Sequence, residues 1–252
     1  MLPATENNNT MKNYCKTIGA LTAASALVAG NASAEVEYEI HTGYTNQYLF
    51  RGLDQGDNLV EVGADVATEW NGLGLSAGAW YGSFSPNPNA GYAVGPDADG
   101  DELDVYAEVS KDLGFATAAA GYIYYMNQRN ILDDNQEVYF SLGQTYFGVD
   151  FSLAYFWDIE TDNDGYTELG ASKGFELSPC LTLNTGATLA YLCEESEFAH
   201  LTAKVSLDWA FTETATLSPF VAASWGLNNE AGNTHSRADE EFVGGTMLSV
   251  SF

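Results

Sequence analysis

Three carboxylates recur at four-residue spacing in one short segment of the chain: Glu61, Asp65 and Glu69. A helix would also bring them to one face, but Val60 and Val62 begin a series of apolar residues at every second position. That alternation predicts a strand with its acids on one face and its apolar residues on the other. A row of carboxylates attracts cations and repels anions, so the chemistry expected of this face is selection by charge.

The same alternation predicts further inward-facing carboxylates on other strands, and together they would line an acidic lumen. The set is Glu37, Glu39, Glu61, Asp65, Glu69, Asp104, Glu108, Glu137, Asp150, Asp158, Glu168 and Asp208, with Lys204 as its single Lys or Arg. In a confined lumen this imbalance favours small cationic or neutral solutes. One alternative stays open, in which large side chains fill the lumen and leave the carboxylates solvated at its rims. The side chains concerned are Tyr106, Tyr122, Tyr124, Tyr139 and Trp80.

The overall charge excludes one class of partner. The chain has 35 acidic and 8 basic residues, too few bases to neutralise nucleic-acid phosphates. Two acidic segments, 97–101 and 160–165, resemble calcium-binding loops. In the twelve-residue loop of an EF-hand the last position is a ligating glutamate, but counting from residue 160 this position is Ala171. We therefore expect no specific metal site and no cofactor, and interpret these segments as solvated external loops. Whether weakly held divalent ions bridge them to lipopolysaccharide stays open.

Catalysis has little support in the sequence. The three histidines are His41, His200 and His235, and no serine stands in a G-x-S-x-G context. We expect a protein that is not an enzyme. Two alternatives stay open: a barrel-type hydrolase, which replacement of His41 and His200 would test, and a structural or adhesive barrel that binds a partner without conducting.

The beginning of the chain resembles a secretory signal peptide. Residues 11–16 form a basic region, residues 17–30 a short apolar core, and residues 32–34 an A-x-A cleavage site. Translation could start at Met1 or Met11. Cleavage after Ala34 would leave residues 35–252 as one domain with 34 acidic and six basic residues.

The rest of the chain divides into twelve segments of roughly ten residues with alternating hydrophobicity. They are 35–45, 60–70, 73–84, 103–112, 115–126, 137–147, 149–158, 166–176, 181–193, 198–211, 215–227 and 241–252. Their connections alternate between short and mostly long, starting with a polar connection at 46–59 and a hairpin signal at Asn71-Gly72. An even strand number with this loop asymmetry is typical of a transmembrane antiparallel β-barrel with short periplasmic turns and longer external loops. We therefore predict an all-β barrel in the outer membrane of a Gram-negative bacterium, in contact with its lipid and lipopolysaccharide.

The last segment supports the barrel. Phe242, Leu248, Val250 and Phe252 fall on one face of an alternating strand that continues to the final residue. We expect this strand to close against the first one, with Phe252 in an aromatic girdle and also acting as the signal for the outer-membrane assembly machinery.

A motif between the first two strands carries a family resemblance. The sequence reads NQYLFRGLDQ from Asn46 to Gln55. It resembles the Tyr-x-Phe-Arg-Gly-x-Ser-Gln element of the TorF-like (Gcw_chp) family of outer-membrane porins, and the matching positions are Tyr48, Phe50, Arg51, Gly52 and Gln55. Asp54 stands where the family usually has Ser. The resemblance implies a porin and brings no catalytic residues.

The residues of this motif also have a physical interpretation of their own. Arg51 lies among carboxylates, and Gly52 permits a turn. We expect Arg51 to anchor an inward-folded loop by pairing with Glu61 or Asp65 on the neighbouring strand.

Overall fold

The structure is a computed structural model, and it describes residues 36–87, 100–128, 134–160, 164–227 and 240–252. These residues form twelve strands. The strands are β1 (Glu37–Phe50), β2 (Leu53–Trp70), β3 (Leu73–Pro86), β4 (Gly100–Asp112), β5 (Thr117–Gln128), β6 (Asn135–Tyr146), β7 (Val149–Asp158), β8 (Tyr166–Ser178), β9 (Leu181–Leu192), β10 (Glu197–Ala210), β11 (Ala215–Gly226) and β12 (Glu240–Ser251). No helix in the described ranges is long and apolar enough to cross a membrane.

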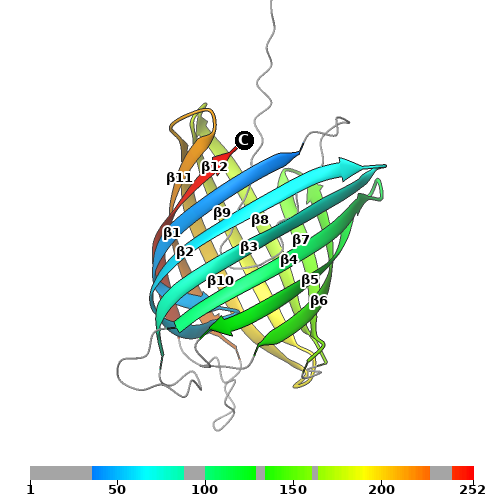
Figure 1. The fold of residues 1–252 in the computed structure, drawn as a ribbon, viewed down its shortest axis with the longest axis vertical. Helices are drawn as coiled ribbons and strands as arrows, with labels where there is room; N and C mark the ends of the chain where they lie inside the picture. Colours follow the sequence, from blue (N-terminus) through cyan, green and yellow to red (C-terminus); the bar gives the residue numbers. More distant parts are fainter. Residues whose placement is uncertain (1–35, 88–99, 129–133, 161–163, 228–239) are drawn as a thin grey trace, which may run out of the picture.

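Each strand pairs antiparallel with its neighbours in sequence, and β12 pairs with β1, so the sheet is a closed barrel (Figure 1). Closure leaves no sheet edge with unpaired backbone groups. The predicted fold, a twelve-strand antiparallel β-barrel, is confirmed.

The two ends of the barrel differ in their connections. At one end, here called the turn end, five short turns join the strand pairs from β2–β3 to β10–β11, and both the start of β1 and the end of β12 lie there. Two of these turns have positive φ at both central residues, Asn71–Gly72 (52° and 74°) and Phe147–Gly148 (52° and 70°). Such turns match the twist of the flanking strands, which explains how two residues suffice. The opposite end, the loop end, has most of the longer connections.

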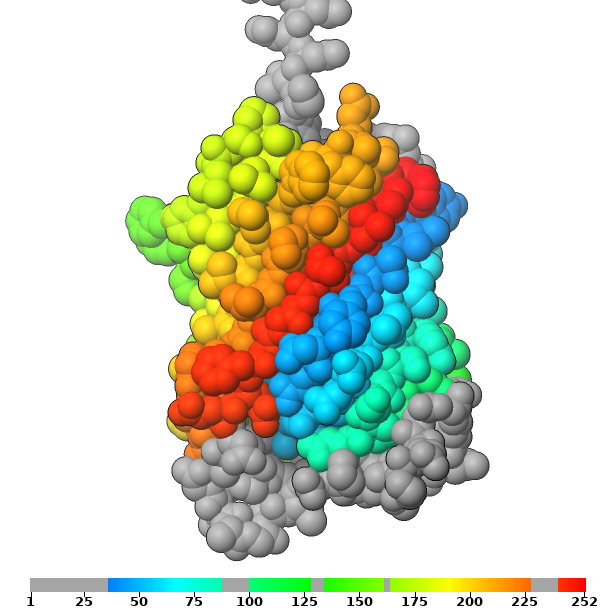
Figure 2. All heavy atoms as spheres, turned by 90° about the vertical axis from the view of Figure 1, so that its left-hand side faces the viewer, coloured from blue at the N-terminus to red at the C-terminus, as the bar shows by residue number. Residues whose placement is uncertain are grey.

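The closing pair is the one expected from the C-terminal alternation. β12 lies beside β1 along its length, as the red and blue strands in Figure 2 show, and Thr42 is opposite Leu248. Beyond the strand, the amide of Phe252 donates to the carbonyl of Tyr38 at 2.9 Å. The last residue of the chain therefore takes part in the seam of the barrel.

The outer surface is apolar and the inner surface polar. Large hydrophobic side chains are exposed on the outward phase of the strands, among them Trp70 (63%) and Phe252 (69%). Buried polar side chains lie on the inward phase, among them Glu39, Glu61 and Glu137. This is the reverse of a water-soluble domain and is the pattern of a barrel wall that faces lipid.

The structure corrects two expectations about the strands. The connection predicted over 46–59 is mostly strand, because β1 and β2 continue to a two-residue turn at Arg51 and Gly52. In β5 the predicted phase is wrong. Ile123 and Tyr125 are buried inside the barrel, whereas Tyr122 lies on the outward phase together with Tyr124. Tyr122 and Tyr124 therefore do not fill the lumen.

Several predictions concern residues outside the described ranges. The signal peptide and its cleavage site, most of the acidic segment 97–101, the centre of the segment 160–165 and His235 belong to this group. They stay predictions.

Candidate functional site

The β1–β2 hairpin, whose tip is Arg51–Gly52, is the element that shapes the interior at the loop end. Arg51 and Gly52 have φ values of 50° and 77°, so the turn is as tight as those at the other end of the barrel. The pairing of β1 with β2 shifts register between Tyr48 and Leu49, and a register shift of this kind bends a strand. The hairpin therefore carries its tip into the lumen, and residues 48–52 are largely buried.

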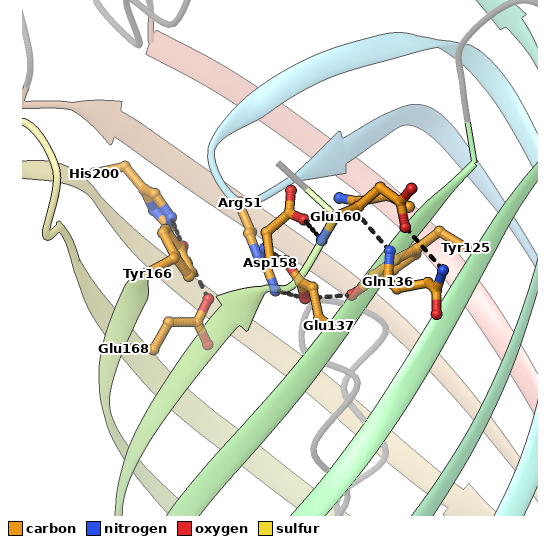
Figure 3. Close-up of polar contacts among 10 residues, drawn as sticks. Arg51, Tyr125, Gln136, Glu137, Asp158, Glu160, Tyr166, Glu168 and His200 are labelled. Atoms are coloured by element: carbon orange, nitrogen blue, oxygen red, sulfur yellow. Dashed lines mark hydrogen bonds and ion pairs between the residues drawn. The ribbon is translucent and has the colours of Figure 1, made fainter. Parts of the chain in front are cut away.

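Arg51 crosses the lumen to the opposite wall. Its Nη1 and Nη2 donate to Oε1 and Oε2 of Glu137 on β6, at 2.6 and 2.7 Å (Figure 3). The two side chains are only 12% and 3% exposed. A bidentate pair of this geometry is among the stronger polar contacts in proteins. Tyr125 Oη on β5 also donates to Glu137, at 2.9 Å.

Three aromatic rings surround the guanidinium group. Its Cζ atom lies 4.6 Å from the ring centres of Phe156 and Tyr166 and 4.9 Å from that of Phe50. The carboxylate of Glu137 and these rings together compensate the burial of the guanidinium charge. Arg51 is thus a permanent positive charge at the centre of the barrel.

The hairpin also contacts the wall nearer to its own strands. Tyr48 packs with Leu59 and Phe84, and its hydroxyl donates to Glu102 at 3.2 Å. Leu49, pointing the other way, packs against a second apolar cluster made of Phe220, Ala222 and Val243 on β11 and β12. Because contacts extend to both sides, the hairpin divides the lumen at this level.

A hydrogen-bonded chain lies beside the hairpin tip. Tyr166 Oη donates to Glu168 at 2.9 Å and lies 2.7 Å from His200 Nε2, while His200 Nδ1 lies 2.9 Å from Thr202 Oγ1. Because the Tyr166 hydroxyl donates its hydrogen bond to Glu168, its oxygen accepts from His200 Nε2–H. His200 Nδ1 is then the unprotonated nitrogen and accepts from the Thr202 hydroxyl. A Cβ atom at Gly52 would lie 2.6 Å from His200 Cγ, so the tip rests directly on this histidine.

The predicted inward carboxylates lie on the inward phase of their strands. Several accept a hydrogen bond from another lumen side chain. Trp80 Nε1 donates to Glu61 at 2.7 Å, Tyr106 Oη to Asp65 at 2.6 Å, Tyr139 Oη to Glu108 at 2.8 Å and Asn184 Nδ2 to Asp208 at 2.7 Å. These donors are neutral, so they fix the carboxylates in place without compensating their charge.

The other predicted inward carboxylates differ in how far their side chains are buried. Glu39, Asp104, Asp158 and Glu168 are buried, Glu69 is half-buried, and Glu37 and Asp150 are exposed near the turn end. The predicted base, Lys204, has its Nζ 4.2 Å from the ring centre of Phe220.

The residues of the motif 46–55 lie in the β1–β2 hairpin. The predicted ion-pair partner of Arg51 is wrong. The structure pairs Arg51 with Glu137 on β6 instead of Glu61 or Asp65 on β2. The carbonyl of Gln55 accepts a hydrogen bond from the Asn87 amide at 2.9 Å. The carboxylate of Asp54 accepts from the backbone amide of Gly56 at 2.9 Å, a local bond that a short acidic side chain can make two residues along the chain.

Two inward acids and one inward aromatic residue lie outside the predicted set. Glu102 precedes the predicted strand 103–112, yet β4 begins at Gly100. Glu241, which accepts from Gln47 Nε2 at 2.7 Å, lies in the predicted closing strand, but the prediction gives it no role. Tyr125 is inward because the predicted phase of β5 is wrong. Strict extension of the alternation to the strand ends would have found the two acids.

A cavity in the described part of the barrel lies on the turn-end side of the β1–β2 hairpin, against the wall formed by β4 to β9. Most of its lining residues are small or polar. They are Glu108, Ser110, Thr117, Ala119, Ser141, Leu142, Gly143, Ser152, Ala154, Glu168, Gly170 and Thr188. The space left by these small side chains lies on the far side of the lumen from β1.

Solved structures with a similar fold are outer-membrane barrels. The COG4313 outer membrane channel from Pseudomonas putida F1 matches with a TM-score of 0.55 and 11% identity, over 88% of this chain and 97% of that one. The NanC porin matches with a TM-score of 0.51 and 12% identity, over 84% and 98%. LpxR from Salmonella typhimurium matches with a TM-score of 0.50 and 9% identity, over 85% and 99%.

At these identities the similarity shows the fold alone. No protein-family model matches the chain, and no curated protein sequence matches it either. The resemblance to the TorF-like family stays a prediction.

Proposed function

We propose that this protein is an outer-membrane channel for the passive diffusion of small solutes, with a preference for cations. The observation that carries the proposal is the polarity of the barrel. Its outer surface exposes apolar side chains, and its inner surface holds fixed carboxylates from most of the strands. A charged inner wall around a confined path selects ions by sign. The similarity in fold to a channel and a porin supports the same interpretation.

Within this function, the β1–β2 hairpin is the constriction. It joins opposite walls through Arg51, and the cavity lined by small side chains of β4 to β9 lies on the turn-end side of it. A solute that passes this level must use the space beside the hairpin, or the hairpin must move. The hairpin is held by side-chain contacts of residues 47–52, whereas the wall is held by continuous backbone pairing, so displacement of the hairpin breaks fewer contacts than a change in the wall.

Current through planar lipid bilayers tests the proposal. Refolded protein, checked for the heat-modifiable gel mobility of a closed barrel, should give discrete conductance steps. Arg51→Gln, which releases the hairpin, should give larger steps. A complete lack of current with both proteins would contradict the proposal.

One alternative has a specific observation in its favour. Because the hairpin contacts both walls, the barrel could be a structural or adhesive one whose lumen stays closed. Such a protein would bind a partner at its loop end and conduct neither as wild type nor after release of the hairpin. The hydrolase alternative is tested separately by lipid and ester hydrolysis with His41→Gln and His200→Gln.

A further inference from the structure

A second cluster in the lumen, far from the hairpin tip along β1, has the composition of a metal site. Glu39 and Asp65 are directly opposite each other in the β1–β2 pairing, and His41 follows Glu39 by two residues on the same face. One possible ligand atom from each of the three residues lies within 4.8 Å of those of the other two. Glu39 and His41 are 7% and 6% exposed.

His41 provides an independent indication that a ligand belongs there. Its Nδ1 atom is buried and makes no hydrogen bond of ordinary geometry, although Asp65 Oδ2 lies at ion-pair distance, 3.4 Å away. A buried polar nitrogen without a hydrogen bond is costly, and a carboxylate that faces it at 3.4 Å leaves a position between the two atoms that a cation fits. A metal ion between His41, Glu39 and Asp65 would satisfy it.

The surroundings of the cluster hold the three side chains in position. Gly63 lies under the ring of His41, and a Cβ atom there would overlap the imidazole. Ser251 Oγ donates to Glu39 Oε2 at 2.9 Å, and Tyr106 Oη donates to Asp65 Oδ1 at 2.6 Å. Hydrogen bonds of this kind orient metal ligands.

We propose that Glu39, His41 and Asp65 bind a divalent transition-metal cation of the Zn²⁺ type inside the lumen. An imidazole nitrogen selects this class over Mg²⁺ and Ca²⁺, which prefer oxygen ligands alone. Ligands of a tetrahedral Zn²⁺ lie roughly 3.4 Å apart. His41 Nδ1 and Asp65 Oδ2 already have this spacing, 3.4 Å. Three protein ligands leave the fourth position open to the lumen.

The proposal goes beyond the transport function and does not depend on it, because binding is measured without any current. Full-length refolded protein in detergent is titrated with ZnCl₂ by calorimetry, and with MgCl₂ and CaCl₂ in parallel. We expect one tight Zn²⁺ per chain and much weaker binding of the other two ions. Co²⁺ added to the wild type should give the visible absorption of a site of low coordination number.

Isosteric variants assign the ligands. We expect each of three single variants to weaken Zn²⁺ binding by at least about tenfold: Glu39→Gln, His41→Gln and Asp65→Asn. His200→Gln is the matched control, since it removes the other described histidine, and it should bind Zn²⁺ like the wild type. Equal affinity in the wild type and the ligand variants, or no Zn²⁺ binding at all, would overturn the proposal. If no ligand variant folds, the Co²⁺ spectrum of the wild type decides alone. A spectrum identical to that of octahedral aqueous Co²⁺ would overturn the proposal.

Discussion

Arg51 and Glu137 form a bidentate ion pair that connects the tip of the β1–β2 hairpin to β6 on the opposite wall of the barrel. The pair is buried, and aromatic rings surround its positive member. Removal of one partner from a buried ion pair typically costs about 3–5 kcal/mol, because the other charge is left unpaired. The contact is thus a strong anchor of the hairpin that a single substitution removes.

Release of the anchor should open the lumen. We expect Arg51→Gln and Glu137→Gln each to raise the single-channel conductance several-fold, while the double variant raises it less, because two neutral amides can still bond. The measurement is single-channel recording in planar bilayers. Lys204→Gln is the control, since it removes the same charge from the lumen and leaves the Arg51–Glu137 pair intact. A conductance rise of equal size in this control would show that charge, and not hairpin position, sets the current.

Gly52 should matter for more than its backbone conformation. Gly52 and Gly72 have similar positive φ values, 77° and 74°, so Ala at either position has a similar backbone strain of about 1 kcal/mol. A Cβ atom at position 52 would also meet His200, whereas one at position 72 meets nothing within 4 Å. We expect Gly52→Ala to increase conductance and hydrogen exchange in the hairpin, and Gly72→Ala to leave both unchanged. Identical behaviour of the two variants would contradict docking of the tip on His200.

Loss of the terminal residue should impair assembly. Phe252 exchanges backbone hydrogen bonds with Tyr38 at the barrel seam and exposes its ring on the outer surface. We expect deletion of Phe252 to reduce strongly the heat-modifiable, membrane-inserted fraction in cells. Phe252→Leu keeps the backbone bonds and Phe252→Tyr keeps the aromatic ring. If the ring is the assembly signal, Leu should resemble the deletion and Tyr the wild type; the reverse order would assign the effect to the seam.

The barrel itself could be predicted from sequence because its cause is local. Alternation at every second residue and turn residues such as Asn71-Gly72 define strand and turn without any distant contact. The alternation failed in β5, where Tyr122, Ile123, Tyr124 and Tyr125 form an unbroken run of large side chains that suits either phase. There the neighbouring strands decide, since Ile123 is opposite Tyr106.

The site could be predicted only in its composition. The acidic residues on β1, β2, β4 and β6 follow from the alternation, but the partner of Arg51 does not. Glu137 is 86 positions away along the chain and five strands away around the barrel, and the bend of the hairpin brings the two together. In the same way, Glu39, His41 and Asp65 appear as three separate inward residues until the β1–β2 register makes them neighbours.

The reversal potential under a salt gradient tests the central claim most directly. With unequal KCl concentrations across a planar bilayer, we predict a reversal potential of the sign that marks K⁺ as the more permeant ion, for the wild type and for Arg51→Gln. Glu108→Gln combined with Asp208→Asn should shift it toward zero, because both carboxylates lie on the lumen wall. A reversal potential of the opposite sign, which marks Cl⁻ as the more permeant ion, would contradict the account.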